Sequence, residues 1–568
     1  MKKLQLFVVV LFVILLPSII YGQKFDRKTL EVTLHKAIEK AYPASVRMWG
    51  FDTVSKMQMS AQFSGVVVAK DGYILTAAHT TVVGKTYKVM FPNGKEAIAL
   101  ALGRITYEAN PIAPDVAMMK IITQGSWPYA EMASSSALKV NEPCISIAYP
   151  ETLNQRLPSV RFGRITNVKN DLGFVQSTCI MEPGDSGGPL FDYMGRVIAL
   201  HSAINVDEAT NYEIPVDYYR TYWSALNKVE DYKALPVQKD SVAADPFANK
   251  ILTIPALTNV SEQFKTDLSK LATNTIKITS TIAAHQQSIN GITLSLDGMG
   301  LPYKTIIISK SSMIGDEPVV STGGGKSFKL NILARDKAND IVILQAPAAI
   351  KNGIKLNAVK NDTLVFNGLG KLLLSPLPDT IGVVSVLGSM QINQPKVFSM
   401  GFLGAAIAYK EGPLVLTRIQ PNSPASEAGL EIGDQVLNIN DKPMQKPEDY
   451  GAELQKYWPG DKVTFKVSHA GNTLTKEITL ISRPPMGSNH PAEMFAGGKS
   501  IRRDGFEKVF THDAIIKANH CGGPVFDTDG NFYGINIARF SRTSTLAIPA
   551  AVISQLVINA LKNSNTQN

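Results

Sequence analysis

Short apolar runs that alternate with glycine-bearing turns dominate the chain. Residues 64–79, SGVVVAKDGYILTAAH, and residues 195–202, GRVIALHS, are typical of this pattern. Short runs of β-branched and apolar residues between turn residues predict β-strands, and a long series of them predicts barrels or sandwiches. No long helical period occurs before the C-terminal end of each half of the chain. The pattern therefore predicts a mainly β protein.

One stretch of the chain occurs twice. GDSGGPLFDYMGRVIAL (184–200) returns as NHCGGPVFDTDGNFYGI (519–535), with a constant offset of 335 and six identical positions of 17. PDVAMMKI, which contains Asp115, is matched by NDIVILQA, which contains Asp340. Internal similarity of this kind indicates a repeated structural unit. We expect one β fold to be present in two copies.

The second copy carries an insertion. Asp115 and Ser186 are 71 residues apart and Asp340 and Cys521 are 181 apart, so 181 − 71 = 110 residues are added. This length is sufficient for a small domain. Within it, SPASEAG (423–429) predicts a short helix, with proline in its first turn and glycine at its end.

Composition and charge narrow the class of protein. A length of 568 residues predicts about three to five domains. Hydrophobic residues make up 45% and charged residues 18%, which is a globular composition. The net charge is +9, but the basic residues are scattered and form no run of five or six. We expect a solvated basic surface and no nucleic-acid partner.

The first 23 residues have the pattern of a secretion signal. Lys2 and Lys3 precede an apolar run over residues 4–16, and Gly22 precedes a polar stretch. This order predicts a Sec signal peptide cleaved near residue 22 or 23, and hence a periplasmic or extracellular protein. A retained membrane anchor is the alternative, but the run is short for a span. We expect no stable membrane span after cleavage.

The sequence has three cysteines, Cys144, Cys179 and Cys521. Export permits disulfides, and Cys144 and Cys179 both lie in apolar, strand-like segments. A bridge between them and two buried thiols that act as small apolar side chains agree equally well with the sequence.

Three segments of the first copy carry candidate chemistry. His79 ends an apolar strand in LTAAH, Asp115 begins the next strand in PDVA, and Ser186 lies between two strands in GDSGGP. A serine hydroxyl attacks an amide only when a base within hydrogen-bond reach takes its proton. We expect His79 to be that base, and Asp115 to fix the tautomer of His79 and stabilise its cation.

The order of these residues along the chain separates two folds. GDSGG also fits the nucleophile turn of α/β-hydrolases, in which the serine precedes the acid and the histidine. Here the order is His, Asp, Ser, and a strand follows the serine. The glycines around Ser186 allow N–H groups to converge on one point. The N–H groups of Gly184 and Ser186, together with that of Asp185, are predicted to form the oxyanion hole.

These segments together resemble the trypsin-like peptidases of the HtrA/Deg group, which join such a domain to PDZ modules in exported bacterial proteins. The resemblance covers about residues 35–225 and rests on TAAH, the Asp115 segment, GDSGGPL and a later Glu-Ile-Pro at 213–215. It implies a double β-barrel with the active site between the barrels, and protein substrates that are often misfolded. HtrA proteins usually have Asn at the position of Asp185, so the partner of this carboxylate is open. They also place PDZ modules after the protease and not inside a second copy.

The inserted stretch, residues 399–482, resembles a PDZ domain. The resemblance rests on FLG (402–404), SPASEAGLEIGD (423–434) and VLNIND (436–441). In PDZ domains such a loop offers N–H groups to the terminal carboxylate of a peptide, and the next strand accepts the peptide as an added strand. A packing module with a blocked groove is the alternative. The residues expected to bind a peptide C-terminus are Phe402, Leu403, Gly404 and Ala405.

The same resemblance suggests a primary specificity pocket. Its floor is expected at Ile180, six residues before the serine, and its wall at Leu200, His201, Ser202 and Ala203. An apolar floor disfavours Lys or Arg at the cleaved position, because their charge is then buried without a partner. We expect small or medium aliphatic residues there.

At the three catalytic positions the second copy has Ser312, Asp340 and Cys521. No histidine occurs between positions 285 and 469, so the expected base is absent. The second copy is therefore predicted to be a degenerate protease fold with a structural or binding role. A cysteine-based site with an unusual base is the alternative.

The complete prediction is a mainly β chain with two chymotrypsin-like double β-barrel domains in tandem, the second interrupted by an α+β PDZ domain. The expected divisions are a signal peptide (1–23), the protease domain (24–228), a linker (229–262), the degenerate domain (263–398 and 483–568) and the PDZ domain (399–482). The expected activity is an exported serine endopeptidase that cleaves unfolded or exposed polypeptide, with the PDZ module recruiting peptide tails. A peptide-binding scaffold or a chaperone with vestigial proteolysis is the alternative. No cofactor or metal is expected, and a homo-oligomer is left open.

Overall fold

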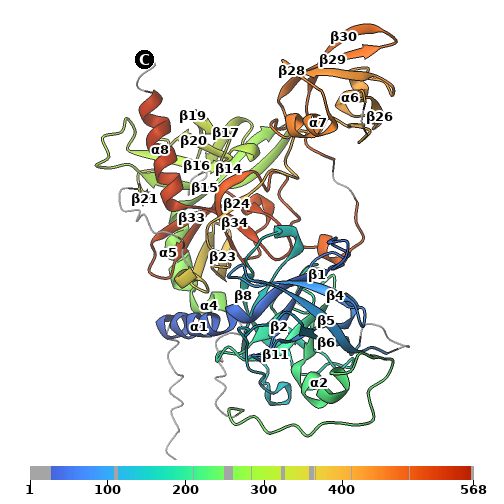
Figure 1. Ribbon diagram of the computed structural model, residues 1–568. Helices are drawn as coiled ribbons and strands as arrows, with labels where there is room; N and C mark the ends of the chain where they lie inside the picture. The colour runs from blue at the N-terminus through green and yellow to red at the C-terminus, as the bar shows by residue number, and fades with distance from the viewer. Residues whose placement is uncertain are drawn as a thin grey trace, which may run out of the picture.

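The computed structural model describes residues 27–107, 113–208, 210–248, 260–282, 284–321, 326–356, 364, 366–410, 412–484 and 487–564. The predicted signal peptide (1–23) lies outside these residues. Figure 1 shows a first β-rich body in blue, cyan and green, which includes α2, a second in green to red, which includes α8, and an orange module that projects from the second body away from the first. No helix in the described ranges has the length and apolar content needed to cross a membrane.

The first body begins with a helix and a closed barrel. Helix α1 (Arg27–Ala41) precedes the first strand, so the expectation that no long helix lies ahead of the strands is wrong. Its buried residues recur at helical spacing and the charged residues between them lie on the other face, which is the pattern of an amphipathic helix. The barrel strands pair in the order β1-β2-β3-β6-β5-β4, and β4 returns to β1. They are β1 (Ser45–Gly50), β2 (Phe63–Val67), β3 (Tyr73–Ala77), β4 (Thr86–Met90), β5 (Glu96–Ile105) and β6 (Val116–Ile121).

A second closed barrel follows in the same body, with the strand order β10-β11-β12-β9-β8-β7. Its strands are β7 (Pro143–Ala148), β8 (Ser159–Asn167), β9 (Val175–Ser177), β10 (Pro189–Phe191), β11 (Val197–Ile204) and β12 (Asn211–Pro215). Helices α2 (Val216–Thr221) and α3 (Trp223–Leu226) come next, and β13 (Asp231–Tyr232) pairs in parallel with β5. The start of the segment expected to be a linker is therefore joined to the first barrel.

The second body repeats the first barrel strand by strand. After α4 (Val260–Gln263) and α5 (Lys265–Leu271), the sheet order is β18-β17-β14-β15-β16-β20-β19, and β21 also pairs with β15. The strand that corresponds to β5 is divided into β18 and β19. The strands are β14 (Thr275–Ile282), β15 (His285–Ser295), β16 (Thr305–Lys310), β17 (Asp316–Ser321), β18 (Ser327–Lys329), β19 (Ile332–Asp336), β20 (Ile341–Gln345) and β21 (Ile354–Lys355).

The other half of the second body is arranged like the second barrel of the first body. Its strands pair in the order β23-β22-β32-β33-β34-β31-β24, and β23 and β24 are consecutive along the chain. Between them, Leu387 bridges His512 of β31 and the Gly388 N–H donates to the Thr511 carbonyl at 2.8 Å. In the first body the corresponding strands β8 and β9 pair directly. The chain between β24 and β31 contains the orange module, and these two flanking strands pair with each other. The elements are β22 (Leu372–Leu377), β23 (Thr380–Val386), β24 (Ile392–Gln394), β31 (Phe506–His512), β32 (Pro524–Asp527), β33 (Phe532–Arg539), β34 (Thr545–Pro549) and α8 (Ala550–Ser564).

The orange module has its own core of apolar side chains, which includes Leu403, Ile407, Leu454 and Phe465. The short helix predicted at residues 423–429 is confirmed as α6 (Pro424–Glu427), where the Ser423 hydroxyl accepts the N–H of Ser426. The elements are β25 (Ala405–Ile407), β26 (Leu416–Ile419), α6, β27 (Gln435–Ile439), β28 (Lys442–Pro443), α7 (Pro447–Leu454), β29 (Lys462–His469) and β30 (Asn472–Thr479).

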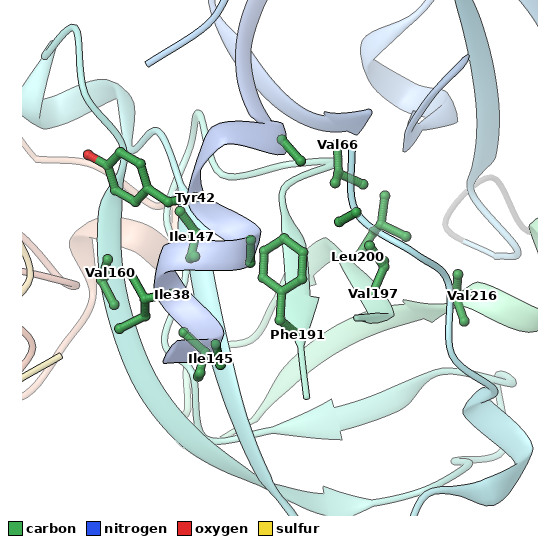
Figure 2. Close-up of a cluster of buried hydrophobic side chains, with 14 of the residues drawn as sticks. Ile38, Tyr42, Val66, Ile145, Ile147, Val160, Phe191, Val197, Leu200 and Val216 are labelled. Atoms are coloured by element: carbon green, nitrogen blue, oxygen red, sulfur yellow. The ribbon is translucent and has the colours of Figure 1, made fainter. Parts of the chain in front are cut away.

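One apolar cluster joins the two bodies. Figure 2 shows Ile38 and Tyr42, from α1 and the turn after it, beside Ile147 and Val160 of the second barrel. The same cluster includes Leu372 and other residues of the second body. Because the copies share buried apolar surface, we expect them to act as one structural unit and not as two independently moving domains.

The cysteines are free thiols in this structure. Cys144 and Cys179 are buried, and their Sγ atoms lie 3.7 Å apart without a bond. The structure therefore corresponds to the second alternative left open by the sequence, in which both act as small apolar side chains.

Candidate active site

His79 and Asp115 meet between the two barrels of the first body. His79 follows β3 in a short 3₁₀ turn, and Asp115 stands just before β6, which pairs with β3. Asp115 has a φ of 58°, in the left-handed region. Its carboxylate accepts the His79 backbone N–H at 2.9 Å and bonds the ring Nδ1 at 2.9 Å. The two contacts fix both the position and the orientation of the imidazole.

The electrostatics of this pair suit a general base. Burial lowers the pKa of His79, but the hydrogen bond and the negative charge of Asp115 raise it by more, so the pKa lies above its ordinary value. Asp115 is 1% exposed, and the Ser202 hydroxyl donates to its Oδ2 at 2.6 Å. The carboxylate is therefore held from two sides, and Nε2 of His79 is directed away from it.

Ser186 lies in a tight turn that ends at β10. Its carbonyl accepts the N–H of Ser64 at 3.0 Å, and the N–H of Gly187 donates to the His201 carbonyl at 2.8 Å. These bonds tie the turn to both barrels. Among the described residues no hydrogen bond joins the Ser186 hydroxyl to the His79 ring. Such bonds are often long without substrate and shorten in the complex.

The turn before Ser186 presents two unpaired N–H groups. Gly184 has a φ of +96°, and a Cβ there would lie 2.4 Å from the Glu151 nitrogen, so only glycine fits. Within the described residues the N–H groups of Gly184 and Ser186 have no hydrogen-bond partner, whereas that of Asp185 donates to the Glu182 carbonyl at 3.1 Å. Of the three donors predicted for the oxyanion hole, two are thus free and one is occupied.

Arg161 is the ion-pair partner of the Asp185 carboxylate, which the sequence left open. Its guanidinium forms a bidentate pair with the Asp185 carboxylate, with N–O distances of 2.6 and 2.7 Å. Both side chains are buried, at 2% and 0% exposure. Asp185 Oδ2 also accepts the Glu182 N–H at 2.9 Å. The Asp185 carboxylate beside Ser186 is therefore paired inside the fold with the guanidinium of Arg161, a residue of β8 that no motif in the sequence marks.

The residues predicted for the specificity pocket have different surroundings in the structure. Ser202 bonds Asp115, and Ala203 is half-buried beside it. Leu200 packs in the apolar cluster that joins the bodies. His201 is fully buried, with Nδ1 2.7 Å from Glu213 and Nε2 2.6 Å from the Ser146 hydroxyl. Ile180 lines a cavity between the two bodies. The preference for aliphatic residues stays a prediction.

Comparisons with known proteins agree with this geometry. The family model "Trypsin-like peptidase domain" matches residues 63–200, and the family model "PDZ domain" matches residues 401–480. A probable periplasmic serine endoprotease, DegP-like, of Bartonella henselae is 22% identical over 392 residues, which cover 68% of this chain and 68% of the relative. The DegP-like protein of Hahella chejuensis is 30% identical over 30% of this chain and 36% of its own length.

This chain is an HtrA-like serine protease that contains a PDZ domain. A solved structure of the HtrA-type protease AlgW with a tripeptide is 16% identical over 79% of this chain and 97% of that chain. Its TM-score of 0.29 is too low for a comparison of domain arrangement. The mainly β fold, with its closed barrels and PDZ module, agrees with the fold class expected from the sequence.

In the second copy of this HtrA-like protease, Ser312 takes the place of the histidine. Its N–H and hydroxyl donate to the two oxygens of Asp340 at 2.6 and 2.8 Å, the same pair of contacts that His79 makes with Asp115. Asp340 has a φ of 57°, and the buried Lys310 ammonium lies 2.8 Å from its Oδ2. The carboxylate that would orient a base is instead held by a hydroxyl and an ammonium.

Cys521 of the second copy is poorly placed for nucleophilic chemistry. Its side chain is fully buried, and burial raises the pKa of the thiol. A thiol attacks as the thiolate, so a raised pKa weakens it. The 3₁₀ turn Ala518–His520 replaces the Gly184 turn of the first copy. The described residues place no histidine in hydrogen-bond contact with Cys521.

The PDZ module has a groove between β25 and α7, with a volume of about 420 Å³. The predicted loop lines it, and the N–H groups of Leu403 and Gly404 have no partner among the described residues. Gly404 has a φ of +81°. The Tyr450 hydroxyl donates across the groove to the Ala405 carbonyl at 2.9 Å. The loop can thus receive a carboxylate, while one acceptor of β25 is already used.

Proposed function

We propose that the chain is an exported endopeptidase that hydrolyses peptide bonds in unfolded or exposed polypeptide with His79, Asp115 and Ser186. The strongest support is the double contact of Asp115 with the backbone and ring of His79, next to a turn with two free N–H groups. The apolar start of the sequence and the relatives named as periplasmic proteins support export to the periplasm. The whole reaction needs groups of the first body alone.

The proposed reaction begins when His79 Nε2 takes the proton of the Ser186 hydroxyl as the oxygen attacks the scissile carbonyl. Asp115 and Ser202 keep the ring in the tautomer with a proton on Nδ1, and Asp115 stabilises the imidazolium. The N–H groups of Gly184 and Ser186 receive the negative oxygen of the tetrahedral intermediate. His79 then protonates the leaving amine, and water repeats the sequence to release the acyl group.

The pH dependence follows from the state of His79. The imidazole acts as a base only when neutral, so activity is lost as pH falls through its pKa. Because Asp115 raises that pKa, we expect kcat/KM to rise with pH through a midpoint above the ordinary 6.5. Asp115→Asn removes the charge and is expected to lower both the midpoint and the plateau. A midpoint below 6.5 in the wild type contradicts this assignment.

The PDZ module is proposed to recruit the C-terminal tails of substrates. We expect a peptide with a free C-terminus and an apolar last residue to bind, and its C-terminal amide to bind at least about tenfold more weakly. Fluorescence anisotropy of the labelled pair on the Ser186→Ala protein measures this without cleavage. Equal affinity for acid and amide contradicts tail recognition by the loop of Leu403 and Gly404.

A casein digest separates the proposal from its alternative. The wild type is expected to degrade casein, and Ser186→Ala is expected to bind it without cutting. A wild type that binds casein and releases it intact is a scaffold or a chaperone, and this result contradicts the proposed activity. The second copy is proposed to be non-catalytic. The hydrogen bond from Ser312 and the ion pair with Lys310, both to the Asp340 carboxylate, support this proposal.

A further inference from the structure

Two segments of the first body near Ser186 contact the second copy. One is residues 180–184, which run directly into Ser186. The other is the β11–β12 hairpin, at its described residues 205–208 and 210, just after β11 ends at Ile204. The positions of the free N–H groups and of Asp115 therefore depend on how these two segments are held.

The segment before Ser186 has a polar anchor in the second copy. Glu182 is 4% exposed, and its Oε2 accepts the N–H of Thr543 at 3.4 Å. Next to it, Asp513 of the second copy accepts the N–H of Phe162 at 2.9 Å and that of Val386 at 2.8 Å. Phe162 follows Arg161, the partner of Asp185, so both sides of the nucleophile turn are linked to the second copy.

The hairpin is held by two buried arginines of the second copy. Arg539 Nη2 lies 3.3 Å from Glu208 Oε1, and Arg542 Nη2 donates to the Asp207 carbonyl at 3.2 Å. Glu208 Oε2 also accepts the N–H of Ala496 at 3.2 Å. Both arginine side chains are 0% exposed, and burial lowers the pKa of Arg539 to about 10. Buried guanidinium groups need their acceptors, so these contacts are costly to break.

Apolar packing does not hold the first segment by itself. A cavity of about 370 Å³ opens between the bodies and is lined by Ile180 and Phe162 on one side and Val383 and Ile515 on the other. A side chain beside a void has lost part of its packing partners. The position of residues 180–184 therefore depends more on the polar contacts of Glu182 and Asp513.

We infer that the second copy is a built-in positioning element, which holds residues 180–184, 205–208 and 210 in the arrangement that cleavage requires. Arg542, Arg539 and Glu208 are its positioning residues. The inference rests on the proposed function, since it assigns these contacts to the site of His79, Asp115 and Ser186. It also gives the inactive copy a reason to keep the protease fold, because β31 and β33 present Asp513 and Arg539 at the required places.

Hydrogen–deuterium exchange on the full chain tests the inference without any need for hydrolysis. Glu208→Gln and Arg542→Met are compared with Glu31→Gln, a matched control. Glu31 of α1 also bonds the second copy, at the N–H of Leu372 (2.9 Å), but its contacts are with β22 and Thr528 and with neither segment. We expect amides of 181–187, 205–208 and 210 to exchange at least about tenfold faster in the first two variants and at the wild-type rate in Glu31→Gln.

Kinetics supply the second readout. Glu208→Gln and Arg542→Met are expected to lower kcat at least tenfold, and Glu31→Gln to keep it within twofold. Unchanged exchange in Glu208→Gln and Arg542→Met overturns the inference, and so does equal acceleration in all three variants. If Arg542→Met does not fold, Glu208→Gln decides alone. A wild type without Ser186-dependent hydrolysis refutes the proposed function, while the exchange result still decides the role of the second copy.

Discussion

Replacing Ser186 with alanine is expected to lower kcat/KM for peptide hydrolysis by about 10⁴- to 10⁶-fold, because it removes the hydroxyl that His79 is proposed to activate. His79→Ala is expected to have a similar effect. The double variant Ser186→Ala/His79→Ala is expected to have about the same kcat/KM as either single variant, because the base contributes nothing without the hydroxyl that it activates. A fluorogenic peptide assay at pH 8 measures all three.

The second copy provides a matched control for this experiment. Cys521 occupies the position of Ser186, so Cys521→Ala makes the equivalent change in the other copy. We expect kcat/KM to stay within twofold of the wild type, since the thiol is buried and its pKa is raised. Two results would falsify the assignment of the chemistry to the first copy. One is a large fall in kcat/KM in Cys521→Ala, and the other is residual hydrolysis by Ser186→Ala that disappears when Cys521 is also replaced.

Replacing Arg161 with methionine has the second largest expected effect. The Asp185 carboxylate, at 0% exposure, would lose its bidentate partner and stay buried. Removal of one partner from a buried pair typically costs about 3–5 kcal/mol of folding stability. Because Asp185 also accepts the Glu182 N–H, the turn with the Gly184 and Ser186 donors would move. We expect kcat/KM to fall by about 10²- to 10³-fold, the scale of a lost oxyanion donor.

Two further variants test the cause of that loss. Arg164→Met changes the same residue type three positions along β8, where the side chain bonds Asn141 and not Asp185. It is expected to keep both the thermal unfolding midpoint and the activity. Arg161→Met/Asp185→Asn removes both charges and is expected to recover most of the lost stability. If Arg161→Met unfolds like the wild type, or if the double variant is no more stable than the single one, the pair does not hold the turn.

Local sequence was sufficient where a motif carries the chemistry. The order of His79, Asp115 and Ser186, with glycines around the serine, singled out residues that the fold places at one interface between barrels. The repeat at an offset of 335 similarly identified Cys521, and the match of PDVAMMKI with NDIVILQA identified Asp340. Ser312, at the position of the histidine, makes the same two contacts with Asp340 that His79 makes with Asp115. These features depend on short segments whose backbone geometry is encoded by neighbours in the sequence.

The partners of the site were not predictable in the same way. Arg161 reaches Asp185 only because β8 and the nucleophile turn are joined by closure of a barrel, and a single arginine in an apolar strand gives no motif. Ser202 was assigned to the pocket wall, but the bulge of β11 after His201 directs its hydroxyl to Asp115. Glu182 and Thr543 are separated by 361 residues, and only the docking of the two bodies brings them together.

The most direct test of the central claim is labelling by a fluorophosphonate followed by peptide mapping. The reagent needs a serine that a base has activated, so it reports on the site itself and does not require a known substrate. We expect one adduct per chain, on Ser186, in the wild type and Cys521→Ala, and none in His79→Ala. An adduct on another residue, or labelling of Ser186 that survives the loss of His79, would contradict the account.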